Sequence, residues 1–426
     1  MSTSGRSGTD GAAPSASDVA AGLREADFVR VLARADGDCL AAAGLLARAC
    51  ADRATPYQVR VGRFGETLAG PDDADSTDRD DATDADDTTV AIGLDPAADV
   101  HLPAAETPAS VTAYDAAGEL GATPDAVLAL AGVVATGRPA STGESAHVLE
   151  RAREAGVARR PGVGVPTDDL VDGLAHSTLA HADYSGDGEA VQAALAELGL
   201  PAELDEAAHR AVASEFALAV TGAETATDRA AEAVERALRP HAIPSAGSGD
   251  SSGDEPGNES DGASASGEVL PDALAPFATV EGYADVLEAV ARERPGAGVA
   301  LALGHDARAD ALDAWRDHGE RAHAVLREAT TGRYDGLFAL RTDDAPVETV
   351  ARLLRDFRSP EPVALVVGES EAAATAVEDS AVGAAMTEAA QSVGGTGGGT
   401  LSRGYARFDP ETDAKEFLAA FREARP

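Results

Sequence analysis

The chain has 426 residues, of which 74 are acidic and 34 basic, and its formal net charge is −40. Its hydrophobic content of 44% excludes a chain that is disordered throughout, because disordered chains combine high charge with few apolar residues. The charge instead predicts a folded protein in the high-salt cytoplasm of an extreme halophile, where a Debye length of about 3 Å at ~1 M salt screens self-repulsion. Counterion release contributes little to DNA affinity in such salt, so the acidic surface does not exclude a nucleic-acid partner.

The sequence predicts neither a secretion signal nor a membrane segment. Residues 1–17 are rich in Ser, Gly, Ala and Thr and lack an apolar core, so we expect a disordered tail rather than a signal peptide. No apolar run approaches the ~20 residues that a membrane span needs. Cys39 and Cys50 are the only cysteines, and on one helix they would lie about 16 Å apart, too far for a disulfide. We therefore expect a reducing cytoplasm and no membrane partner.

An α/β pattern opens the folded part of the chain. Residues 28–32 form a short apolar run with Val29 and Val31, which predicts a buried strand. The following segments are predicted as strands at 55–64, 88–95 and 98–103, and as helices at 39–53, 108–120, 124–136, 167–182, 189–199, 204–219 and 223–238. Strands precede residue 105 and helices follow it, so we expect residues 18–242 to form a parallel-sheet domain with a helical extension. The acidic insertion 71–87 is predicted to be a solvated surface loop.

A second α/β pattern follows a boundary at residues 243–268. This boundary is rich in Gly, Ser and acidic residues and has no large apolar residue across its centre, which predicts a flexible linker. The segments beyond it are predicted as helices at 279–294, 307–330, 345–357, 371–392 and 410–425, and as strands at 298–304, 336–341, 362–369 and 403–408. Residues 269–426 are of a length that suits one compact, smaller α/β domain.

The turn after the first strand carries candidate metal ligands. Asp36 and Asp38 lie between a predicted strand and a predicted helix, where an α/β domain presents carboxylates. Arg34 precedes them, and a guanidinium repels a cation. His176 and His181 are five positions apart, whereas zinc pairs on a helix are four apart, so we expect them to form a packing face of a helix.

A glycine-rich stretch near the C-terminus carries the candidate nucleic-acid site. Glycines permit close backbone approach, so free amides can meet a phosphate, and arginine and tyrosine side chains can add charge and base stacking. The alternative, that the stretch is only a flexible turn, stays open. The candidate nucleic-acid-binding residues are Gly397, Gly398, Gly399, Thr400, Arg403, Tyr405 and Arg407.

Taken in chain order, these features resemble those of the DHH phosphoesterase superfamily, and in particular those of archaeal RecJ-like proteins. The resemblance rests on residues 34–37, 89–95, 174–187, 281–296 and 393–408, and it covers most of the chain. It implies an N-terminal α/β domain with metal-binding Asp and His residues, a linker, and a smaller DHHA1-like domain whose glycine-rich motif helps to bind the substrate.

The sequence departs from the family pattern at the residues that carry the chemistry. In the family the first motif reads Asp-x-Asp-Gly, whereas here Arg34 replaces the first Asp and Leu32 replaces a preceding histidine. Asp36 matches the second Asp, and Asp95 matches the Asp at the end of a later strand. The Asp-His-His triplet is absent, and Thr400 replaces the histidine of a Gly-Gly-His motif.

Three functions are weighed on this basis. We favour a RecJ-like protein of DNA replication or repair whose nuclease site has decayed, acting as a single-stranded-DNA-binding or scaffold subunit with a GINS-like replication complex, like the nuclease-dead superfamily member of the eukaryotic replicative helicase. The alternatives are an active exonuclease with Mn or Mg at Asp36, Asp38, Asp95 and His101, or a small-molecule phosphoesterase that needs the same ligands. His101 by itself is predicted to be a surface or packing histidine. In the favoured case, Arg34 fills the old ion position and pairs with Asp36 or Asp95.

Overall fold

The structure is a computed structural model of the chain. It describes residues 14–66, 68, 87–94, 98–104, 107–141, 143–223, 226–244 and 276–425. The predicted tail before residue 14, the acidic loop up to residue 86, most of the linker, and Asp95 lie outside the described residues.

A parallel four-stranded sheet forms the first part of the fold, as the sequence predicts. In spatial order its strands are β2 (Tyr57–Gly62), β1 (Phe28–Arg34), β3 (Asp87–Ile92) and β4 (Val100–Leu102). Val29, Val31 and Ala33 of β1 are fully buried, which places this strand in the core. The helices packed around the sheet are α1 (Ala16–Arg24), α2 (Gly37–Asp52), α3 (Ala109–Glu119) and α4 (Ala126–Ala135).

The predicted helical extension follows. Its elements are η1 (Gly143–Ser145), α5 (Ala146–Glu154), β5 (Ala158–Arg159), α6 (Leu170–His176), α7 (Gly188–Glu197), α8 (Glu206–Gly222), α9 (Asp228–Glu235) and β6 (His241–Ala242). Asp169, Asp187 and Asp205 begin α6, α7 and α8, and each side chain accepts hydrogen bonds from amides of the first turn. Among the helices that the structure describes, none has the length and apolarity that crossing a membrane requires.

The segment after the linker begins with three helices, α10 (Val280–Glu293), α11 (Pro295–Ala302) and α12 (Arg308–Glu328). The strand predicted at residues 298–304 is wrong, because most of this apolar run belongs to α11, which Pro295 begins. The first of these helices, α11 and the first half of α12 share one hydrophobic core with the parallel sheet. The predicted boundary at residue 268 therefore separates residues that pack together.

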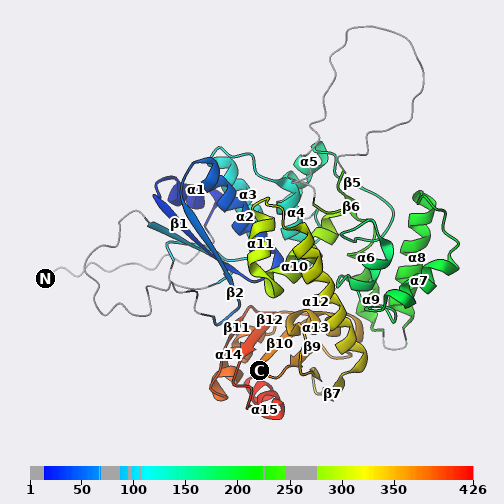
Figure 1. Ribbon diagram of the computed structural model, residues 1–426. Coiled ribbons are helices and arrows are strands. Elements are labelled where there is room, and N and C mark those ends of the chain that lie inside the picture. The colour runs from blue at the N-terminus through cyan, green and yellow to red at the C-terminus, as the bar shows by residue number, and fades with distance from the viewer. Residues whose placement is uncertain are drawn as a thin grey trace, which may run out of the picture.

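A six-stranded mixed sheet forms the C-terminal part. In spatial order its strands are β11 (Thr396–Gly399), β12 (Arg403–Arg407), β10 (Glu371–Ala376), β9 (Val363–Val367), β8 (Leu337–Arg341) and β7 (Thr330–Tyr334), accompanied by α13 (Val347–Leu353), η3 (Leu354–Arg358), α14 (Val382–Ser392) and α15 (Ala414–Ala424). The helix predicted at residues 371–392 is wrong before residue 382, since the alanine-rich β10 is buried between β9 and β12. Figure 1 shows this sheet below the first one, with β11 near the end of β2 and α10 in the centre of the molecule.

Candidate functional site between the two sheets

The turn between β1 and α2 holds Asp36 at the beginning of a helix. Asp36 is the N-cap of α2, and its Oδ1 accepts a hydrogen bond from the Cys39 amide at 2.9 Å. Only 6% of the residue is exposed. A capping carboxylate satisfies amides that the helix leaves unpaired, so one of its oxygens is committed to the fold.

Arg34 pairs with Asp36, as the sequence predicts. Its Nε donates to Asp36 Oδ2, its Nη1 donates to the Gly93 carbonyl at 3.0 Å, and its guanidinium lies 4.9 Å from the centroid of the Phe64 ring. Burial alone would raise the pKa of Asp36, but the charge of Arg34 and the Cys39 amide lower it below its usual value. The second oxygen of Asp36 therefore binds a fixed cation that belongs to the chain.

Asp38 binds the backbone of a neighbouring helix. Its Oδ2 accepts from the Ala109 amide at 2.8 Å, and its Oδ1 accepts from the Ser110 amide at 3.0 Å. These amides open α3, where the helix dipole favours an anion. Burial and the charge of Asp36 raise the pKa of Asp38 to about 6. Asp38 thus holds α3 against α2, and both of its oxygens have partners.

Glu288 of α10 lies at the N-terminal end of α2. Its Oε2 accepts from the Gly37 amide at 2.8 Å, and its Oε1 pairs with Arg292 at 2.8 Å. Arg292 also pairs with Glu348 of α13 at 2.9 Å, which links the N-terminal core to the C-terminal part. Helix N-termini bind anions such as phosphate, and here the anion is a carboxylate of the chain itself.

Our reading of the sequence missed Glu288, although a pattern in α10 marks it. Glu281, Asp285 and Glu288 recur at helical spacing, and all three are buried. Buried carboxylates require specific partners, so such a stripe indicates an internal polar network. Glu281 pairs with His241 at 2.8 Å, and Asp285 accepts from the Trp315 ring nitrogen at 2.8 Å.

The predicted glycine turn is an edge strand in the structure. Gly397, Gly398 and Gly399 belong to β11, which pairs with β12 in antiparallel register. Thr400 lies in the connection between them, and its Oγ1 accepts from the Arg403 amide at 3.2 Å. A Cβ atom at Gly399 would lie 2.1 Å from the Arg403 carbonyl oxygen, so the close crossing there requires glycine.

The charged and aromatic residues of β12 all have protein partners. Arg403 donates to the Thr136 carbonyl at 3.0 Å, and burial lowers its pKa. Tyr405 is 1% exposed, and its ring lies beneath the Arg63 guanidinium at 5.2 Å, so in this conformation it offers no free face to a base. Arg407 is more exposed and pairs with Glu66 at 2.8 Å.

The described donors around the turn, which do not include Asp95, do not fit a divalent cation. In two-metal sites, the two manganese or magnesium ions are bound by several carboxylates and imidazoles. Asp36 and Asp38 are committed to Arg34 and to backbone amides, and among the described residues no group of three or more His, Cys, Asp or Glu side chains is placed to hold a metal. His101 lies half-buried on β4.

The two histidines near residue 180 have separate environments. His176 contacts Asp172 at 3.2 Å, whereas Nδ1 of His181 contacts Nδ1 of His323 at 3.0 Å. The rings of His181 and His323 stack with centroids 5.2 Å apart, and both residues are buried. Burial lowers the pKa of His181 to about 4 and that of His323 well below its usual value.

This histidine pair predicts a loss of stability in acid. The unfolded chain binds protons as the pH falls through about 6.5, whereas folded His181 does so only near pH 4, so stability falls across this window. At pH 5 the loss from His181 is about 2 kcal/mol relative to pH 7. Urea unfolding in molar KCl at both pH values should show a smaller loss for His181→Gln than for the wild type. His147→Gln, which removes an exposed histidine paired with Asp115, should leave the loss unchanged.

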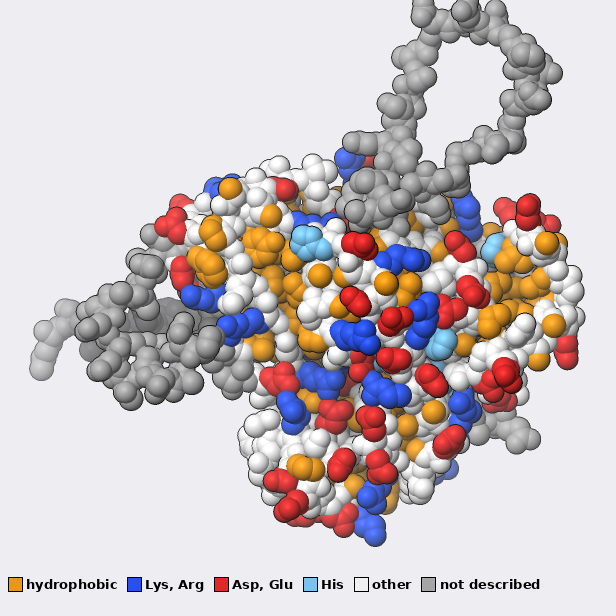
Figure 2. Space-filling model, in the orientation of Figure 1, with side chains coloured by type: hydrophobic (Ala, Val, Ile, Leu, Met, Phe, Trp, Pro, Cys, Tyr) orange, Lys and Arg blue, Asp and Glu red, His pale blue; other side chains and the backbone are white. Residues whose placement is uncertain are grey.

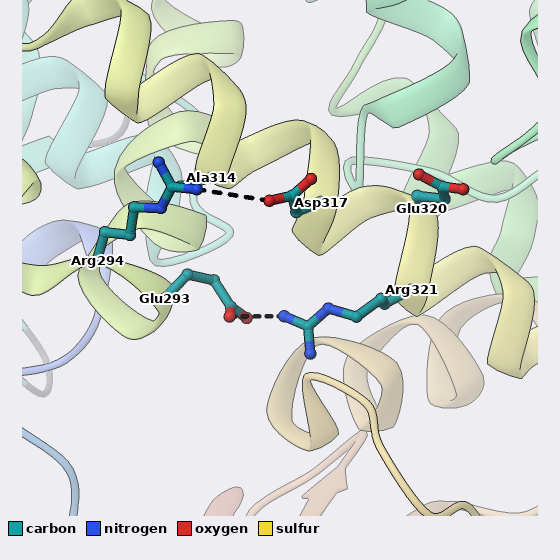
Figure 3. Close-up of a pocket in the computed structure, with 6 residues that line it drawn as sticks. All are labelled: Glu293, Arg294, Ala314, Asp317, Glu320 and Arg321. Atoms are coloured by element: carbon teal, nitrogen blue, oxygen red, sulfur yellow. Dashed lines mark hydrogen bonds and ion pairs between the residues drawn. The ribbon is translucent and has the colours of Figure 1, made fainter.

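A surface hollow of about 520 Å³ lies between the end of α10 and α12. Its lining residues are Glu293, Arg294, Ala314, Asp317, Glu320 and Arg321. In Figure 3, Arg321 pairs with Glu293 at 2.6 Å and Arg294 with Asp317 at 3.6 Å, whereas Glu320 lies apart from both pairs. Figure 2 shows the same mixture of acidic and basic side chains over the surrounding face. Four of the five charged side chains that line the hollow are thus paired with each other.

Comparison with known proteins places this geometry in a family. A family model described as the C-terminal domain of the uncharacterized protein rrnAC1427 matches residues 329–423, which contain the second sheet. The protein rrnAC1427 of Haloarcula marismortui is 47% identical over 426 residues, which is the full length of both chains.

Solved structures match this chain along most of its length. CDC45 from Entamoeba histolytica matches with a TM-score of 0.51 at 9% identity, over 96% of this chain and 98% of that one. RecJ from Thermus thermophilus with Mn²⁺ matches with a TM-score of 0.43 at 13% identity, over 96% of this chain and 54% of that one. A RecJ exonuclease bound to manganese matches with a TM-score of 0.43 at 14% identity, over 97% and 94%. The match to CDC45 shows that this chain shares the fold of that protein, and the two sheets confirm the predicted α/β fold class.

Proposed function

This chain belongs to the family of the Haloarcula marismortui protein rrnAC1427, and we propose that it is a RecJ-like protein of DNA replication or repair whose nuclease site has decayed. It acts as a single-stranded-DNA-binding or replisome scaffold subunit. The observation that carries this proposal is the largely buried Arg34–Asp36 pair at the end of β1. The Arg34 guanidinium is bound by the Asp36 carboxylate, which matches a metal ligand in the DHH superfamily pattern.

Arg34 can replace the charge of a metal ion but not its chemistry. Metal ions in phosphodiester hydrolysis lower the pKa of a bound water and polarise the phosphoryl group. A guanidinium has no coordination sites and stays protonated, so it neither generates hydroxide nor acts as a base. The Arg34–Asp36 pair therefore supports the proposal that this domain keeps the fold but does not hydrolyse phosphodiesters.

Glu288 places an anion of the chain where a substrate phosphate could bind. Its carboxylate binds the Gly37 amide at 2.8 Å, at a helix end suited to a substrate phosphate. The chain therefore carries its own cation beside Asp36 and its own anion at the beginning of α2. The Glu288 carboxylate continues into ion pairs with Arg292 and Glu348, and the charge of Arg292 also helps to lower the pKa of Asp36.

The proposed partners follow from the fold and from the second sheet. CDC45 has the same fold, and this supports a role within a replication assembly, for which a GINS-like complex is the partner to test. The candidate contacts with single-stranded nucleic acid are in β11 and β12. In the molar salt expected for this chain, affinity depends on local arginines, backbone amides and stacking rather than on net charge.

A nuclease assay tests the proposal. Purified protein in molar KCl with Mn²⁺ should release no product from a 5′-labelled single strand above the level of Asp36→Ala. Product that depends on Asp36 would overturn the proposal and restore the metal-dependent exonuclease. A pull-down from a halophilic lysate should recover a GINS-like complex, and its absence would count against the scaffold role.

A further inference from the structure

Residues 63–66, which we name the cover turn, cross from the first sheet to the second. The turn follows β2 and is closed by hydrogen bonds from the Glu66 amide to the Arg63 carbonyl at 3.2 Å and from the Arg63 amide to Glu66 Oε2 at 2.9 Å. Gly65 has φ +76°, a left-handed conformation that favours glycine. The turn is therefore a defined structural element.

The ring of Phe64 lies between the two candidate sites. On one side the Arg34 guanidinium is 4.9 Å from the ring centroid. On the other side a Cβ atom at Gly398 would be 3.3 Å from the Phe64 Cβ atom, and one at Gly65 would be 3.2 Å from the Gly397 amide nitrogen. The cover turn thus lies directly against the backbone of β11.

The charged residues at the two ends of the cover turn, Arg63 and Glu66, bind side chains of β12. Glu66 pairs with Arg407 at 2.8 Å. Arg63 donates to the Tyr405 hydroxyl at 3.0 Å and pairs with Glu371 at 2.6 Å. The turn therefore occupies the Tyr405 ring and the Arg407 guanidinium, both of which are candidate contacts with nucleic acid.

We propose that the cover turn occupies the place of one nucleotide and must move away before single-stranded nucleic acid can bind. Phe64 takes the position of an unstacked base between the Arg34 guanidinium and the glycine strand, because aromatic rings and bases stack on arginine alike. The Glu66 carboxylate takes the position of a phosphate on Arg407. This inference rests on the proposed function and adds that the binding surface is closed by the chain itself.

Competition between the turn and a strand gives a measurable consequence. The apparent affinity for a strand is reduced by the fraction of molecules in which the turn is open, so removing the contacts of the turn raises that affinity. In Phe64→Ala/Glu66→Gln, fluorescence anisotropy with a labelled oligo-dT in molar KCl should show binding about tenfold tighter or more. Circular dichroism checks that the variant is folded.

Matched variants make the result specific. Glu206→Gln removes an exposed acid that pairs with Arg210 on α8, so it changes the net charge like Glu66→Gln and should leave affinity unchanged. Glu66→Gln alone is nearly isosteric and should give a smaller gain, which covers the case in which the double variant fails to fold. Equal affinity in the wild type and the cover-turn variants, whether both bind or neither does, overturns the inference. The nuclease assay is independent of this result, so the proposed function stands or falls separately.

Discussion

Replacing Arg34 with alanine is expected to destabilise the fold by about 3–5 kcal/mol. The change leaves the Asp36 carboxylate buried without its cation, and it also removes the hydrogen bond to the Gly93 carbonyl and the contact with Phe64. Removing one partner of a buried ion pair costs more than the pair contributes, because the remaining charge is desolvated and unpaired. Urea unfolding in molar KCl at pH 7 measures the loss.

Arg30→Ala on the same strand is the matched control. Arg30 pairs with Asp87 at 2.9 Å, but its side chain is 48% exposed. Exposed pairs contribute about 0–1 kcal/mol and are screened further by salt, so this variant should lose less than about 1 kcal/mol. Equal losses for Arg30→Ala and Arg34→Ala would show that Arg34 does not compensate a buried charge.

Gly282→Ala is expected to destabilise the protein by about 3 kcal/mol or more. A Cβ atom at Gly282 in α10 would lie 2.2 Å from the Val165 carbonyl carbon and 2.3 Å from the Pro166 nitrogen. These are backbone atoms, so rotation of a side chain cannot relieve the overlap. The helix would have to move away from residues 165–166, together with its buried carboxylates.

Gly118→Ala provides the opposite expectation. Gly118 lies in α3, and a Cβ atom there would meet nothing within 4 Å. Because alanine favours a helix more than glycine does, this variant should gain about 0.5–1 kcal/mol. The midpoints of thermal unfolding should move in opposite directions for the two variants. A gain in both would mean that helix propensity, not the close approach at Gly282, determines the result.

The first sheet could be predicted from the sequence because its signals are local. Val29 and Val31 alternate with exposed or half-buried residues in a single short run, and the turn residues follow at once. Residues 298–304 and 371–376 could not be assigned in the same way. A short apolar run does not distinguish a buried helix from a buried strand, and an alanine-rich strand contradicts local helix propensity until its neighbours are known.

The candidate site shows the same division between local and distant contacts. The Arg34–Asp36 pair could be predicted because the two residues are close in sequence and one replaces a metal ligand. The bond from Gly37 to Glu288 spans 251 positions, and the bond from Arg63 to Tyr405 spans 342. The spacing of carboxylates on α10 marks Glu288 as part of an internal polar network, but no local pattern encodes its partner Gly37 or the contacts of the cover turn, so these become visible only in the folded chain.

Equilibrium binding of Mn²⁺ is the most direct test of the central claim, that the chain replaces the metal site with its own charges. Electron paramagnetic resonance measures free Mn²⁺ in molar KCl, where potassium competes with weak binding at the acidic surface. The wild type and Asp36→Asn should bind Mn²⁺ equally, because Asp36 is committed to Arg34 and to the Cys39 amide. Additional Mn²⁺ held by the wild type and lost in Asp36→Asn would contradict this account.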